Sequence, residues 1–85
     1  MEDKALIATK LGELLKLTRI GEGIEKINYG KAPHGEEYCY IIFKNGNSIK
    51  VNVTADSGVA LISDVIRRIS TKKKNVISMK RVLTE

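Results

Sequence analysis

The stretch "EYCYIIFKNGNSIKVNVTADSGVALISDVI", residues 37–66, decides the fold because it joins a hairpin signal directly to a helical pattern. Two runs rich in β-branched and aromatic residues, 37–44 and 48–54, flank Asn45-Gly46, the dipeptide that best accepts the positive φ angles of a tight turn. From residue 57 onward, apolar residues recur at spacings of three and four, which indicates an amphipathic helix. These residues are Leu61, Ile62, Val65, Ile66 and Ile69. The stretch therefore predicts two antiparallel strands and then a helix over residues 57–70.

The length of the hairpin loop decides which side chains face the core. A two-residue loop pairs Lys44 with Asn47. This pairing places six side chains on one face of the hairpin, namely Tyr38, Tyr40, Ile42, Ile49, Val51 and Val53. A four-residue loop gives the same faces, whereas a three-residue loop with a bulge exchanges them. With the two-residue loop, Cys39, Ile41 and Phe43 lie on the opposite face, where a helix or a partner must cover them. They are a candidate interface of a homodimer.

The remaining segments complete an α+β fold. Residues 3–19 have helical spacing, with Asp3 as the expected N-cap and the glycines of "IGEG" as the stop. Their apolar face is Ile7, Leu11, Leu14, Leu15 and Thr18. Residues 23–31 indicate a first strand, and 76–84 alternate like a final strand, either beside 48–54 or pairing with a second subunit. We expect a single domain over residues 1–85, in the order α-β-β-β-α with a C-terminal β strand, as an antiparallel three-stranded sheet packed by two helices.

Composition sets limits on the class of protein. The chain has 85 residues, of which 42% are hydrophobic and 29% are charged, and this is ordinary globular usage with room for one modest core. No apolar run approaches the roughly 18 residues of a membrane span. The single cysteine cannot form an internal disulfide. These features predict a cytoplasmic protein that does not insert into a membrane.

The positive charge is concentrated at the C-terminal end. Residues 67–85 contain seven lysines and arginines against one glutamate, whereas residues 1–66 contain eight cationic and nine acidic residues. The cationic residues of the last segment are Arg67, Arg68, Lys72, Lys73, Lys74, Lys80 and Arg81. Such asymmetry favours an anionic partner, namely nucleic acid, a nucleotide or an acidic protein surface. The plain alternative is a lysine-rich segment that only keeps a small protein soluble.

The turn between the second predicted strand of the hairpin and the helix is a second candidate site. Thr54, Ser57 and Gly58 stand where a helix N-terminus can hold a phosphate group. The interpretation we favour is that Asp56 or Ser57 caps the helix, since the turn has neither the lysine nor the glycines of known phosphate loops. A nucleophilic serine lacks a base, because the only histidine lies in a separate loop. No His, Cys and Asp spacing matches a metal site. We therefore predict no catalytic residue, no metal, no cofactor and no enzymatic activity.

Two resemblances bear on function. The order α-β-β-β-α resembles the double-stranded-RNA-binding domain in topology only, since that family has a lysine cluster at the start of its last helix, where this chain has Asp56. The chain lacks the exposed aromatic pairs of RNA-recognition motifs, although Tyr38 and Tyr40 could stack on bases if they were exposed.

The second resemblance covers "YIIFKNGNSIKVNVTADSGVALISDVIRRI", residues 40–69, which is similar to small uncharacterised proteins of Gram-positive gut bacteria and their phages. This resemblance implies an accessory protein of a mobile element and carries no residue roles. The expected function is a small non-enzymatic binding protein that recognises nucleic acid or a nucleotide through the basic C-terminal segment. The alternative is a mobile-element inhibitor that binds a host protein or sequesters a nucleotide signal.

Overall fold

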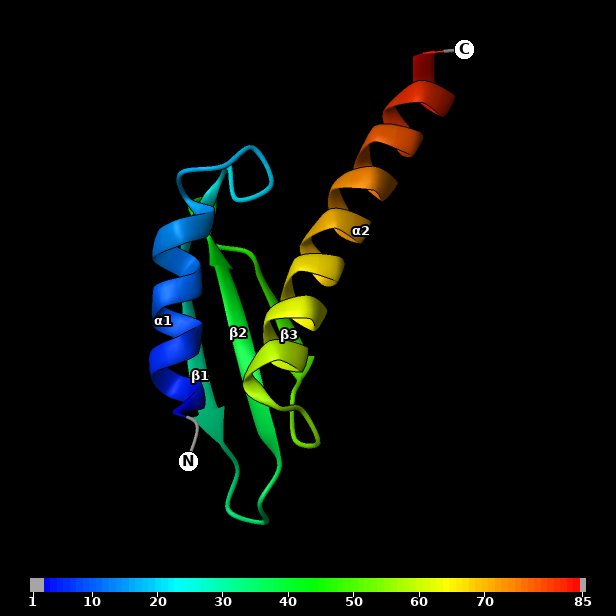
Figure 1. The fold of residues 1–85 in the computed structure, drawn as a ribbon. Coiled ribbons are helices and arrows are strands. Elements are labelled where there is room, and N and C mark those ends of the chain that lie inside the picture. Colours follow the sequence, from blue (N-terminus) through cyan, green and yellow to red (C-terminus); the bar gives the residue numbers. More distant parts are fainter. Residues whose placement is uncertain (1–2, 85) are drawn as a thin grey trace.

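The computed structural model describes the backbone of residues 3–84 and the side chains of residues 3–71. Figure 1 shows the five elements in the predicted order α-β-β-β-α. They are α1 (Lys4–Leu15), β1 (Ile24–Lys31), β2 (Glu37–Phe43), β3 (Ser48–Asn52) and α2 (Gly58–Thr84). The strands form one antiparallel sheet in the order β1-β2-β3. The α+β class and the three-stranded antiparallel sheet are confirmed.

The hairpin between β2 and β3 has the three-residue loop, and the faces are therefore exchanged relative to the two-residue loop. Ile41 pairs with Ile49 and Tyr40 with Lys50. The Phe43 N–H donates to the Asn47 carbonyl at 2.8 Å, which leaves residues 44–46 as the loop. Gly46 has φ +91°, the left-handed conformation that this loop requires at its last position. The pairing shift by one residue moves every side chain of β2 to the other face.

Both helices cover the same face of the sheet (Figure 1), and the core lies between these two layers. The core consists of Ala8, Leu11, Leu15, Ile24, Ile27, Cys39, Ile41, Ile49, Val53, Leu61, Val65 and Ile69. Aliphatic side chains supply nearly all of it, in a chain with only three tyrosines, one phenylalanine and no tryptophan. The other face of the sheet carries no helix among the described residues.

Helix α1 begins as predicted and ends earlier. The Asp3 carboxylate accepts the Leu6 N–H at 3.0 Å and caps the helix. Gly12 lets the helix approach β1, since a Cβ on Gly12 would stand 3.0 Å from the Ile27 nitrogen. The helix stops at Leu15 because the Thr18 hydroxyl donates to the Leu15 carbonyl at 2.8 Å, an alternative to a further helical turn. Leu14, predicted on the inner face, is 63% exposed.

Helix α2 replaces the predicted C-terminal strand. It runs from Gly58 to Thr84, so the residues 76–84 are helical and neither extend the sheet nor form a strand arm. The physical reason is the absence of a stop signal, because no glycine or proline occurs after Gly58. Its first half packs on the sheet through the predicted apolar stripe, and its second half runs past the sheet (Figure 1). In the described part of the chain, no helix is both long and apolar enough to cross a membrane.

Candidate functional site

The turn before α2 is occupied by its own hydrogen bonds. The Ser57 hydroxyl accepts the Ala60 N–H at 3.2 Å and therefore caps the helix. The Thr54 hydroxyl accepts the Glu37 N–H at 2.9 Å and ties the turn to the start of β2. Thr54 and Ser57 thus have structural partners, and Gly58 is buried. The small-ligand role of this turn stays a prediction.

Asp56, in the same turn, faces a second acid. One oxygen of its carboxyl group is buried and accepts no hydrogen bond within the described part of the chain. A hydrogen bond between the Asp56 and Asp64 carboxyl groups requires a proton on one of them. The pKa of Asp56 is raised, chiefly because its protonated carboxyl can donate to Asp64 and then because of burial. Negative charge shared between two acids makes this turn a poor place for a phosphate.

The predicted interface formed by Cys39, Ile41 and Phe43 is wrong for its first two residues. Cys39 and Ile41 are 0% exposed, and Phe43 is partly buried and packs against the core. The three-residue loop is the cause, since it turns these side chains toward the helices. Burial raises the pKa of the Cys39 thiol to about 11. A homodimer stays a prediction, but it cannot use this face.

The uncovered face of the sheet is the surface that the sequence interpretation missed. We call it the tyrosine face and define it by the residues of the three strands that point away from the helices. They are Lys26, Asn28 and Gly30 of β1, Tyr38, Tyr40 and Ile42 of β2, and Ser48, Lys50 and Asn52 of β3. A three-residue loop between the two predicted hairpin strands would have predicted the tyrosine face from the sequence. With that loop, one face of the hairpin is wholly apolar and the opposite face is mixed. The apolar face consists of residues 39, 41, 43, 49, 51 and 53.

Two aromatic rings stand side by side at the centre of the tyrosine face. The ring centroids of Tyr38 and Tyr40 are 6.3 Å apart, with the ring planes inclined by 44°. The Lys50 ammonium lies over the Tyr38 ring, 4.5 Å from its centroid. Gly30 makes room for Tyr40, since a Cβ on Gly30 would stand 3.1 Å from that ring. Both tyrosines are partly buried.

The margins of the tyrosine face are polar. The Tyr38 hydroxyl donates to the Glu36 carboxylate, and this bond raises the pKa of Tyr38. The His34 Nε2 lies 3.0 Å from the other Glu36 oxygen. At the opposite end, β1 contains an irregularity between Ile24 and Lys26.

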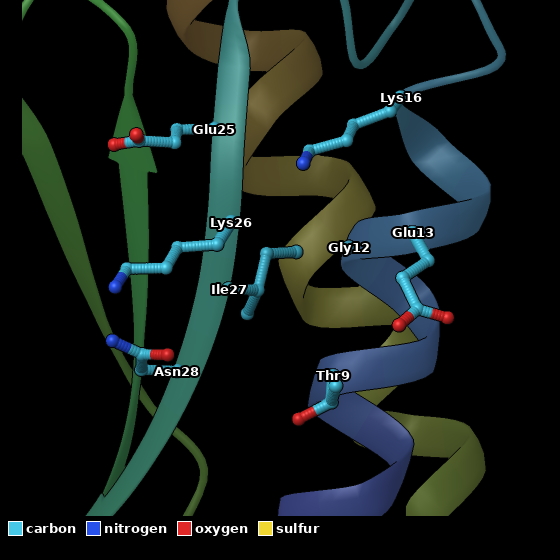
Figure 2. A pocket seen from close by; sticks show the side chains of 8 residues that line it. All are labelled: Thr9, Gly12, Glu13, Lys16, Glu25, Lys26, Ile27 and Asn28. Atoms are coloured by element: carbon cyan, nitrogen blue, oxygen red, sulfur yellow. The ribbon is translucent and has the colours of Figure 1, made fainter.

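A groove lies between α1 and β1, one of the two edge strands of the sheet. Its volume is about 210 Å³, and it is lined by Thr9, Gly12, Glu13, Lys16, Glu25, Lys26, Ile27 and Asn28. Figure 2 shows the Ile27 side chain pointing toward α1, while Glu25, Lys26 and Asn28 point away from it. Glu25 therefore accompanies Lys26 at the margin of the tyrosine face.

The predicted basic residues belong to one helix. Arg67 and Arg68 are exposed, and the Arg67 Nη1 lies 3.8 Å from Asp64 Oδ1. Both arginines line a hollow of about 270 Å³ between α2 and β3. Lys72, Lys73, Lys74, Lys80 and Arg81 lie within α2, but their side chains fall outside the described residues.

A polar cluster fixes the end of the sheet opposite the β2–β3 loop. The Lys4 ammonium donates to Glu37 Oε1 at 3.2 Å and to the Val53 carbonyl at 2.9 Å. The Tyr29 hydroxyl donates to the other Glu37 oxygen. This bond raises the pKa of Tyr29 to about 12, and the same bond, with help from Lys4, lowers the pKa of Glu37. The cluster connects α1, β1, β2 and the segment that follows β3.

Comparisons with family models, curated proteins and solved structures return no match to this chain. Among the described residues, no group of three or more His, Cys, Asp and Glu could hold a metal ion.

Proposed function

We propose that this chain is a non-enzymatic binding protein for nucleic acid, and that the cationic residues of α2 contact phosphate. The observation that carries the proposal is the continuity of α2 from Gly58 to Thr84. All seven lysines and arginines after residue 66 lie within this one helix. The second half of the helix extends beyond the sheet (Figure 1). A cationic helix that projects from its domain is accessible to a polyanion along its length.

Residue spacing supports a contact with an extended partner. Positions 67, 74 and 81 are all cationic and are seven residues apart. Seven residues span two helical turns, or about 10 Å of helix. These positions therefore share one side of α2, and a row of three charges at this spacing suits a phosphate backbone better than a single nucleotide.

The charge balance of the whole chain points the same way. The protein has a formal net charge of +5 at neutral pH. Asp64, which lies 3.8 Å from Arg67, is the acidic side chain that lines the hollow beside the two arginines. The Arg67 side chain is exposed, and an ion pair at a protein surface contributes at most about 1 kcal/mol, so Arg67 can exchange this partner for a phosphate.

The test is the salt dependence of binding. The variant Lys72→Ala/Lys73→Ala/Lys74→Ala removes three charges and keeps helix propensity, because alanine favours helix. We expect weaker binding to a short fluorescein-labelled DNA duplex, measured by fluorescence anisotropy. The slope of log affinity against log salt should shrink by about 0.9 for each phosphate that the variant can no longer neutralise.

A matched control variant distinguishes a binding site on α2 from an effect of the net charge of the protein. Lys10→Ala/Lys16→Ala/Lys44→Ala removes the same charge from exposed positions outside α2. It should retain most of the affinity and of the salt slope. An equal decrease in affinity in the two variants would show that net charge alone acts, and unchanged affinity in the α2 variant would refute the proposal.

A further inference from the structure

We propose that the tyrosine face is a base-stacking subsite that makes this protein a binder of single-stranded nucleic acid. The inference rests on the proposed function for the polyanion, but it is carried by different residues and a different observation. Tyr38 and Tyr40 present two adjacent rings, 6.3 Å apart, on a sheet face that no described helix covers. Stacking on exposed aromatic rings is the principal way in which proteins hold unpaired bases.

The distance between the rings selects an extended strand. Successive bases in a duplex are about 3.4 Å apart along the axis, and their flat faces are covered by their neighbours. Rings separated by 6.3 Å cannot each stack on successive bases of that helix. An unstacked single strand can place one base on each ring. The geometry thus favours two bases of a single strand over a duplex.

The strands beside the rings supply the other groups that such a ligand needs. Asn28 is the cross-strand neighbour of Tyr40 on β1, and Asn52 is that of Tyr38 on β3. The Asn28 amide can donate to and accept from a base edge. The Asn52 Oδ1 already accepts the Thr54 N–H at 2.9 Å, so the Asn52 amide offers its N–H groups as donors. Lys26 and Lys50 supply positive charge, and no acidic residue occurs among the nine that define the face. Glu36, just before β2, and Glu25, within β1, lie at the two margins of the tyrosine face. Their negative charges limit the path that the nucleic-acid backbone can take.

Lys50 has two positions in this scheme. In the free protein its ammonium covers the Tyr38 ring at 4.5 Å. A base that stacks on Tyr38 displaces the ammonium, and the flexible side chain then reaches the neighbouring phosphate. Gly30 gives the Tyr40 ring its place, so a side chain at position 30 would push that ring out of position.

The experiment uses the full chain and two labelled probes, a uridine decamer and an abasic decamer with the same backbone. Tyr38→Thr and Tyr40→Thr remove the rings and keep a β-branched residue in the strand. Each substitution should weaken binding to the uridine decamer by about tenfold, the size expected for one stacked base. Binding to the abasic decamer should not change. Tyr40→Phe, which keeps the ring, should bind like the unsubstituted protein.

The outcomes separate this inference from the proposed function. If the threonine variants bind the uridine decamer as tightly as the unsubstituted protein does, base stacking is overturned. In that case, weaker binding by the Lys72→Ala/Lys73→Ala/Lys74→Ala variant would still support the phosphate contacts of α2. Equal affinity of the unsubstituted protein for the two decamers also overturns base stacking. Circular dichroism of each variant checks the fold. If the threonine variants change sedimentation and not nucleic-acid affinity, the face pairs two copies of the chain and the inference fails.

Discussion

Glu37 shows how one side chain can connect most of the elements of a small fold. Its carboxylate accepts from Lys4 of α1 and Tyr29 of β1, and its backbone N–H donates to Thr54. Lys4 in turn donates to the Val53 carbonyl, 49 positions along the chain. The sequence suggested none of these contacts, because local patterns do not reach across such separations. Hydrogen bonds to a charged group are among the stronger polar contacts in proteins.

The lowered pKa of Glu37 predicts a pH dependence of stability. A carboxyl whose pKa is lower in the folded state contributes stability above its unfolded pKa, and this contribution disappears as pH falls through the folded pKa. The melting temperature should therefore fall on acidification below about pH 4.5. Glu37→Gln should have a lower melting temperature at neutral pH and a smaller acid dependence. Glu13→Gln, at an exposed position on α1, is the control, and an unchanged acid profile in Glu37→Gln would contradict this role.

At the scale of elements, the end of α1 depends on a glycine that packs closely against the helix. A Cβ on Gly21 would stand 1.9 Å from the Leu15 carbonyl oxygen, well inside contact distance. The Gly21 N–H also donates to the Thr18 hydroxyl at 3.2 Å. The chain thus folds back tightly on the last turn of α1 before it enters β1. The sequence pattern identified Gly21 as a stop signal but not this contact.

Gly21→Ala should be strongly destabilising. We expect the free energy of unfolding, measured by urea denaturation, to fall by about 3 kcal/mol or more, because backbone must move to relieve the overlap. Gly35→Ala is the comparison, since a Cβ there meets nothing within 4 Å and only the positive φ of +96° is unfavourable. Its cost should be about 1–2 kcal/mol. A smaller effect for Gly21→Ala than for Gly35→Ala would contradict the close packing at Leu15.

Helix α2 shows a second limit of prediction from the sequence at the scale of elements. The sequence predicted its apolar stripe and a cap at Asp56 or Ser57, of which the structure shows Ser57. The prediction of a strand over 76–84 failed because the alternation is weak: each alternating set mixes apolar residues with a cation, Arg81 in one and Lys80 in the other. Without a glycine or proline, helix propagation adds a hydrogen bond for each residue and continues.

At the scale of the whole molecule, the sheet has one covered and one uncovered face. The two helices bury the side of Cys39, Ile41 and Ile49, and the tyrosines occupy the other side. This division turns a predicted interface into core and places the tyrosines on a surface. It adds the tyrosine face, in the middle of the sheet, as a second candidate surface beside the cationic residues of α2.

Cys39 provides a direct test of this division. A buried thiol whose pKa is raised to about 11 should react very slowly with a thiol reagent at neutral pH, and rapidly once the chain is unfolded in denaturant. The variant Cys39→Ala/Ser48→Cys places the only thiol on the tyrosine face and should react at once in the native state. Rapid labelling of Cys39 in the native protein would show that its face is not covered by the helices.

The sequence by itself determined the order α-β-β-β-α, the N-cap of α1 and the inner stripe of α2, because these depend on local propensity and periodicity within a few residues. It narrowed the N-cap of α2 to Asp56 or Ser57, and its prediction of a final strand was wrong. It also determined the excess of positive charge after residue 66. Only the tertiary structure decided the register of the β2–β3 hairpin, and with it which face the helices cover. The loop signal Asn45-Gly46 fits loops of two and three residues, and the choice follows from burial of the wholly apolar face under α1 and α2.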